Sequence, residues 1–378
     1  MSDNTDVGAE PTIVQKRLGE WLEEDDPDSM SESITRYGRY IWRKHVFMGL
    51  CILAALAVIG AALTLGTYPI SFFESYAIIW DHITGNIVDQ TADDVIFRLR
   101  MPRIVAGIVG GAGLAVAGVA MQSTLKNPLA DPYTTGVSAG ASLGATIAIV
   151  LGVSVLPLGG VGIVGNAFIF SLIPTAIMVL ISRMKRASPT MMIMAGIAVM
   201  YLFGAITTIL KLWSDPDALK ALYNWEVGSL GLASWDDLAI MFPIVLIGVI
   251  VVQLLSRQLN VLATGDENAK SLGVNASQLR TLCLIVVALM AASIVSFTGM
   301  IGFVGLVCPH VVRIVIGADN RYLVPASAVF GIALLLTADL IGRTIIAPTI
   351  IQVGVITAFL GGPMFLWLLL RKQSKVWG

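Results

Sequence analysis

Arginines cluster beside two apolar segments of this chain. Arg98, Arg100 and Arg103 crowd the start of one segment, and Arg343 stands at the end of another. A guanidinium group presents a rigid fork of N–H donors that matches a carboxylate, so this pattern is typical of a site that receives acidic side chains of a partner protein. Two other interpretations stay open: the arginines can reach lipid headgroups, or they can pair locally, as Arg343 can with Asp339 one turn earlier.

A polar insert of residues 260–280 separates two other apolar segments. We expect it to form two short helices hinged at Gly273, with Asp266 capping the first helix and Asn275 or Ser277 capping the second. A connection between membrane spans needs only a few residues. An ordered, helix-forming insert therefore predicts a docking surface for another protein.

The sequence lacks the motifs of several common functions. No GxxxxGK[ST] loop occurs, so nucleotide phosphates cannot be held in the P-loop manner, and no HExxH motif or nucleophile elbow indicates an intramembrane enzyme. An ion-coupled secondary transporter would need buried ionisable ligands, but only Asp339 stands near the end of a span. His310 follows Pro309 in an apolar segment and is interpreted as a structural histidine. The cysteines have no CxxC spacing and are interpreted as small buried hydrophobic residues: Cys51, Cys283 and Cys308.

The elements that position these residues are predicted to be membrane-spanning helices. The 378 residues are 56% hydrophobic and 13% charged, with a mean hydropathy of +0.82, which indicates an all-α, polytopic membrane protein. A helix over residues 281–317 would be about 55 Å long, so we expect the chain to turn back at Gly299, Gly302 and Gly305. The apolar segments predict about ten membrane spans: 46–66, 103–122, 134–152, 160–182, 190–211, 237–256, 281–298, 300–316, 323–342 and 353–370.

Charge predicts the domain organisation and the orientation. Residues 1–45 are expected to be a flexible acidic cytoplasmic extension, since residues 1–34 hold ten acidic and two basic side chains. Residues 46–372 then form one transmembrane domain, followed by a cytoplasmic tail at 373–378. With both termini inside, 18 of the 24 basic residues lie on the cytoplasmic side, as the positive-inside rule prefers. This orientation places the polar insert in the cytosol and the arginine cluster outside.

Several motifs together resemble the FecCD/BtuC-like permeases of ABC importers for iron-siderophores, haem and vitamin B12. They occur in the same order as in that family between about residues 46 and 372. The motifs are Arg100–Arg103 (RMPR), Gly118–Gln122 (GVAMQ), Asn127–Pro132 (NPLADP), Gly136–Ala141 (GVSAGA), Gly302–His310 (GFVGLVCPH), Ala338–Arg343 (ADLIGR) and Val353–Pro363 (VGVITAFLGGP).

The resemblance implies a type II ABC importer permease fold, with a homodimer of ten-helix subunits in the cell membrane. It also implies two cytosolic ABC ATPase subunits, which bind ATP and Mg, and an extracytoplasmic substrate-binding protein. This chain is then no enzyme, binds no cofactor, metal or nucleic acid itself, and carries a metal chelate such as an iron-siderophore, haem or cobalamin. A molybdate or tungstate importer of the same family is the alternative, and a secondary transporter is a remote one.

Residue roles follow from the resemblance as well. Arg100, Arg103 and Arg343 correspond to arginines that receive glutamates of the binding protein. Residues at about 264–280 correspond to the coupling helices that contact the ATPase: Asp266, Glu267, Ala269, Lys270, Leu272, Gly273, Val274 and Leu279. The inner gate loop and the path correspond to Ser188, Pro189, Thr190 and Asn127, with the fifth and tenth spans. One departure is that Ile350 and Gln352 replace the glutamate and second proline that the family has before its last helix.

Overall fold

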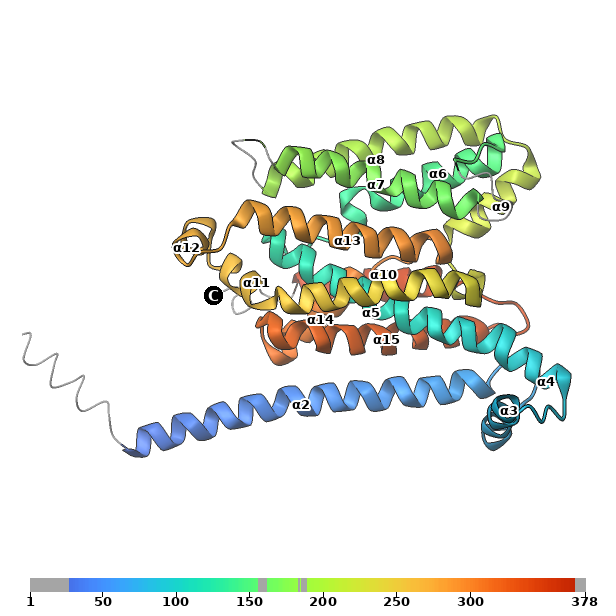
Figure 1. Ribbon diagram of the computed structural model, residues 1–378, viewed down its shortest axis with the longest axis horizontal. Helices are drawn as coiled ribbons and strands as arrows, with labels where there is room; N and C mark the ends of the chain where they lie inside the picture. Colours follow the sequence, from blue (N-terminus) through green and yellow to red (C-terminus); the bar gives the residue numbers. More distant parts are fainter. Residues whose placement is uncertain (1–26, 156–161, 183, 185–188, 371–378) are drawn as a thin grey trace, which may run out of the picture. The chain divides into compact units, whose positions relative to one another are not determined.

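The computed structural model describes residues 27–155, 162–182, 184 and 189–370, and in these residues all regular structure is helical (Figure 1). The chain divides after Val46 into an N-terminal unit and the main unit Phe47–Gly378. Of the extension predicted for residues 1–45, the described part begins at Pro27 and already belongs to helix α2 (Pro27–Thr64). The inner-gate residue Ser188 and the tail at 373–378 lie outside the described residues.

The predicted spans are present as long and short apolar helices. Seven helical stretches of the described chain are long and apolar enough to cross a membrane. They are residues Ile41–Thr64 of α2, the continuous stretch Gln90–Leu125, α7 (Gly162–Ser182), α8 (Pro189–Leu212), α10 (Trp235–Leu254), α13 (Ala276–Thr298) and α15 (Asn320–Thr344). The remaining three predicted spans are the shorter apolar helices α6 (Val137–Leu151), α14 (Val304–Ile316) and α16 (Val353–Leu370).

Short helices gather at the two ends of this bundle (Figure 1). The insert end carries α11 (Ser256–Ala263), α12 (Asp266–Ser271) and the start of α13. The opposite end, which carries Arg100, Arg103 and Arg343 and is called the arginine end here, has α3 (Phe72–Thr84), α4 (Gln90–Asp94) and α9 (Pro216–Glu226). Because helices at one end of a bundle come from distant parts of the sequence, each end brings together residues that no local pattern connects.

The central helix of the main unit is α5 (Met101–Leu125), which continues from α4 through the π-helical turn η1 (Val95–Arg100). Its glycines allow neighbouring backbones to approach closely. A Cβ atom added at Gly118 would lie 1.8 Å from the Gly305 oxygen of α14, and one added at Gly111 would lie 2.5 Å from the Gly331 oxygen of α15. The small residues that the sequence places in this span therefore serve helix packing, as in other membrane proteins.

Two segments that are not α-helical lie within the bundle and bond to one another: the connection between α13 and α14, and the segment after α5. Helix α13 ends at Thr298, and α14 begins only at Val304, which confirms the predicted turn near Gly299. With 13 residues, α14 is about 20 Å long, shorter than a bilayer core. The N–H of Ile301 donates at 3.2 Å to the hydroxyl of Tyr133, which belongs to the 3-10 turn η2 (Pro132–Thr135). Non-helical backbone at membrane depth requires such protein partners.

Candidate coupling surface and arginine cluster

The polar insert contains one helix more than the sequence predicted, and one of its caps is different. Helix α11 precedes the hinge region, and the segment after Gly273 is the first part of the long helix α13. Asn275 caps α13 by accepting from the Gln278 N–H, as predicted. The prediction that Asp266 caps the first helix was wrong, because Gly265 is the N-cap and Asp266 is the first helical residue.

Asp266 is instead the centre of an ion-pair network. Its carboxylate accepts from Arg280 at 2.6 and 2.8 Å and from Lys126 at 2.7 Å. These hydrogen bonds, that of Arg280 first, lower the pKa of Asp266 to about 2 although partial burial opposes the shift. Arg280 also donates to the Thr124 carbonyl at 3.3 Å. Because Lys126 and Thr124 stand at the end of α5, the network fastens α12 to the central helix of the bundle.

A second network fastens α11 to the loop before α15. The side-chain amide of Asn260 donates to the Asp319 carboxylate at 2.7 Å, and its Oδ1 accepts from the Asn320 N–H at 2.8 Å. Burial alone would raise the pKa of Asp319, but hydrogen bonds from Arg321 and Asn260 lower it to about 2. Asn320 in turn accepts from the Ser123 hydroxyl on α5 at 3.0 Å. Both polar networks of the insert thus end on α5.

Only some of the eight predicted coupling residues can touch another protein. Ala269 and Leu279 are buried, and Val274 is half-buried against the core. The others lie exposed on α12 and the hinge: Asp266, Glu267, Lys270, Leu272 and Gly273. Leu272 is 66% exposed in this polar surface. A large apolar side chain within a charged rim is typical of a protein contact.

A groove of about 480 Å³ separates this surface from the end of α7, and it is lined among others by Lys270, Asn275, Ser182 and Met192. The start of α13 lines the groove and is bonded to the end of α7, because the Ser277 hydroxyl donates to the Ser182 carbonyl at 3.2 Å. Of the predicted inner-gate residues, Pro189 is half-buried and Thr190 is exposed at the start of α8.

The predicted path residue Asn127 lies at the insert end, just beyond α5. Its side chain accepts from the Leu129 N–H at 2.9 Å and so stabilises the turn after Lys126. Asn127 is half-buried. Its position next to the lysine that holds Asp266 places it beside the Asp266 ion-pair network.

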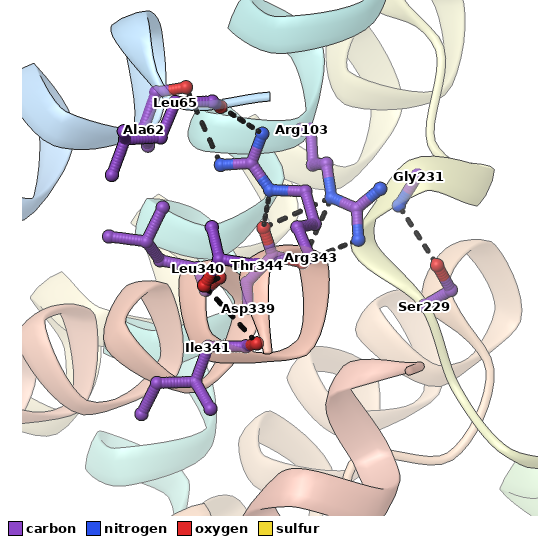
Figure 2. A network of polar contacts seen from close by, with 10 residues as sticks. All are labelled: Ala62, Leu65, Arg103, Ser229, Gly231, Asp339, Leu340, Ile341, Arg343 and Thr344. Atoms are coloured by element: carbon purple, nitrogen blue, oxygen red, sulfur yellow. Dashed lines mark hydrogen bonds and ion pairs between the residues drawn. The ribbon is translucent and has the colours of Figure 1, made fainter. Parts of the chain in front are cut away.

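At the other end, Asp339 joins two of the predicted docking arginines (Figure 2). Arg103 on α5 contacts both carboxylate oxygens through its Nε, at 2.9 and 3.0 Å, and Arg343 contacts Asp339 at 3.1 Å from one turn later in α15. The side chains of Arg103, Arg343 and Asp339 are 12%, 10% and 4% exposed. The local pairing that the sequence left open for Arg343 is therefore present, and it includes Arg103.

The end of α2 and the residues just after it supply further partners for the arginines. Arg100 is buried and donates to the carbonyls of Leu63, Thr64 and Tyr68. Arg343 donates to the Leu65 carbonyl, and also to that of Ala62, at 3.4 Å (Figure 2). The last carbonyls of a helix lack intrahelical donors and attract cations. Arg98 instead projects outward and pairs with Asp94 at 2.8 Å.

The segment that departs from the family pattern packs against the bundle at this end. The N–H of Ile351 donates to the Gly342 carbonyl at 2.8 Å, and that of Gly354 donates to the Gly228 carbonyl at 3.3 Å. Ile350 is exposed and Gln352 is half-buried. The two replaced positions therefore flank Ile351, which bonds this irregular connection to the end of α15.

Two contacts of this site were not predicted from the sequence. The first is the pair of Arg103 with Asp339, which are 236 positions apart. The second is the bond from Lys126 to Asp266. The residue types were visible in the sequence, but no spacing rule connects such distant positions.

Comparison with known proteins agrees with this architecture. The model of the FecCD transport family matches residues 52–371. The chain is 39% identical to the hemin transport system permease protein HmuU of Yersinia pestis, over 86% of this chain and 95% of that protein. It is 38% identical to the cobalamin import system permease protein BtuC of Halobacterium salinarum, over 87% and 89% of the two chains.

A relative with another named substrate and a solved structure also match. The molybdate import system permease protein MolB of Haemophilus influenzae is 31% identical, over 85% of this chain and 94% of that protein. The solved structure is an inward-facing ABC transporter assigned to the metal-chelate type. Its TM-score is 0.75 at 29% identity, and the match covers 86% of this chain and 99% of the other. The chain belongs to the FecCD transport family and is a multi-pass membrane permease subunit of an ABC transporter.

Proposed function

We propose that this chain is the permease of an importer that takes up a metal chelate, delivered by a substrate-binding protein and driven by a separate ATPase. The observation that carries the proposal is the α11–α12 insert, whose exposed Leu272 is surrounded by charged side chains and whose polar networks end on α5. An ATPase that moves this surface would pull directly on the central helix. Relatives named for hemin and cobalamin support a chelate as the substrate class.

In this proposal the insert end faces the cytosol and the arginine end faces outward. The distribution of Lys and Arg along the sequence supports this orientation. Two copies of the chain form a homodimer, with one ATPase subunit below each copy and with both termini in the cytoplasm. Pro189 and Thr190 then lie at the cytosolic start of α8, whose Met192 lines the groove beside the coupling surface. Ser188, outside the described residues, is proposed to belong to the same inner gate.

The arginine end is the proposed contact for the binding protein. Arg103 and Arg343 share one carboxylate, so the pair of guanidinium groups keeps a net positive charge at this end. Acidic side chains of the binding protein would be attracted by this excess charge. Arg100, which is buried beneath this end, supports it by donating to the Leu63 and Thr64 carbonyls at the end of α2.

A molybdate importer is a second candidate, because the relative MolB is named for that substrate. The two substrate classes differ in size and charge, so a direct assay separates them. The permease is reconstituted in proteoliposomes with its ATPase, and ATP hydrolysis is measured with the binding protein loaded with hemin, a ferric siderophore, cobalamin or molybdate. Stimulation by one of the chelates supports the proposal, and stimulation by molybdate alone replaces it with the second candidate. A complex that hydrolyses ATP without response to any loaded binding protein would refute an importer role.

A further inference from the structure

Helix α3 carries an exposed apolar face that the transport function does not use. The helix has 13 residues and lies at the arginine end, where it runs across the direction of α5 and α15 (Figure 1). One face of α3 presents five large apolar side chains, with Phe73 84%, Ile83 70% and Trp80 67% exposed. The full set is Phe72, Phe73, Tyr76, Trp80 and Ile83. Their spacing of three and four residues places them on one side of a helix.

The other two sides of α3 have different partners. Ile78 and Ile79 pack against the small core of Ile70, Ala92 and Ile96. Glu74 and Asp81 border a hollow of about 220 Å³ that is also lined by Asp89 and Asp93. On a helical wheel these two carboxylates lie opposite the centre of the aromatic face. The helix is therefore amphipathic on its solvent side, with an apolar face and an acidic face.

The orientation of α3 is fixed by specific bonds at both ends. Ser71 and Glu74 form a capping box at its start, and Gly85 ends the helix in the left-handed conformation. His82 contacts Asp93 at 2.8 Å, and its ring stacks on Phe97 with 3.6 Å between the ring centroids. The aromatic face cannot turn inward without breaking these contacts, so it requires an apolar environment outside the chain.

A lipid bilayer supplies that environment. The stretch Ile41–Thr64 of α2 is long and apolar enough to cross a membrane, and its exposed side chains include Leu50, Leu53 and Leu56. Leu65, one residue past the end of α2, is exposed as well. The ring of Phe72 on α3 lies against Gly60 of α2, so the aromatic face of α3 adjoins this apolar surface. Tryptophan and tyrosine prefer the boundary between headgroups and acyl chains, and a helix that lies across the spans matches the geometry of an interfacial helix.

We propose that α3 is an in-plane membrane helix at the arginine end. Its face of Phe73, Tyr76, Trp80 and Ile83 is buried in the boundary between headgroups and acyl chains, while Glu74 and Asp81 face the water. The helix thereby fixes the depth of η1 and of Arg100 relative to the bilayer surface. This placement depends only on the membrane location of the chain and not on its substrate or its protein partners.

The proposal is tested by measuring lipid contact residue by residue. Single cysteines replace Phe73, Trp80 and Ile83 on the aromatic face, and Glu74 and Asp81 on the acidic face as matched controls. The background lacks the native Cys51, Cys283 and Cys308, which are buried. Each variant is labelled with bimane and placed in nanodiscs whose lipids carry a nitroxide at a shallow acyl position, since an interfacial helix inserts by about 5–10 Å.

Quenching by the lipid nitroxide should be several times stronger at positions 73, 80 and 83 than at positions 74 and 81. Equal quenching at all five positions, or stronger quenching by a water-soluble nitroxide at 73 and 80, would overturn the proposal. Quenching of the aromatic face only by a spin-labelled binding protein would assign it to that protein instead. A second measurement uses the native tryptophans. Brominated lipids should quench tryptophan fluorescence less in the Trp80→Phe variant than in the wild type.

Discussion

The buried contact of Asp339 with Arg103 and Arg343 allows a quantitative test of what holds the arginine end together. The substitution Asp339→Asn keeps the shape of the side chain and removes its charge. Both arginines are about nine-tenths buried, so each loses the opposite charge that offsets its burial. Removing one partner of a buried ion pair costs about 3 to 5 kcal/mol. The asparagine oxygen still accepts one hydrogen bond and Arg343 keeps its carbonyl partners, so we expect a loss of about 2 to 4 kcal/mol.

A loss of this size is measurable in the purified permease. For large domains, 1 kcal/mol shifts the unfolding temperature by about 2–4 °C, so Asp339→Asn should lower it by about 5 °C or more in nanodiscs. The double variant Arg103→Gln with Asp339→Asn should lose less than the sum of the two single variants, since residues in contact do not act additively.

Asp236→Asn provides the matched control, because Asp236 is exposed in the first turn of α10 and its removal changes the net charge equally. We expect this control to unfold within about 4 °C of the wild type, because exposed charges near a helix start contribute up to about 1 kcal/mol. If Asp339→Asn matched the control, or if the double variant were fully additive, the carboxylate would not be what neutralises the two arginines.

Three other predictions concern the insert end. Leu272→Asp should weaken co-purification of the ATPase by about tenfold or more while membrane insertion stays normal, because it places a charge at an apolar contact; unchanged binding would remove Leu272 from the coupling surface. A cysteine at Asn268 should react with an impermeant maleimide only after the membrane is opened, whereas one at Asp217 should react in intact cells, and the reverse pattern would invert the proposed orientation. The pKa of Asp266 is lowered from 3.8 to about 2, so the stabilisation from its ion pairs is present above about pH 4 and is lost as the pH falls toward 2. The difference in unfolding temperature between wild type and Asp266→Asn should hence be constant from pH 5 to 8, and a difference that shrinks within this interval would show that Asp266 is protonated there.

The predicted helices agree with the structure because their signals are local. A run of about 20 apolar residues is long enough to span the bilayer wherever it occurs, and Asn275 caps α13 through a bond only three residues away. Gly299 ends α13 for an equally local reason, since its φ of +70° suits glycine. The capping prediction for Asp266 was wrong because the helix starts one residue earlier, with Gly265 as its N-cap. The carboxylate instead bonds Arg280 and Lys126 from two other elements.

The sequence by itself determined the class of this protein, the order of its apolar helices and its family, because each of these depends on residue types and short motifs. Only the tertiary structure decided which charges meet. Arg103 meets Asp339 because α5 and α15 approach closely at Gly111 and Gly331, and the aromatic face of α3 points outward because His82 is held by Asp93. Such contacts depend on how distant helices pack, and packing is a property of their surfaces together rather than of any single segment.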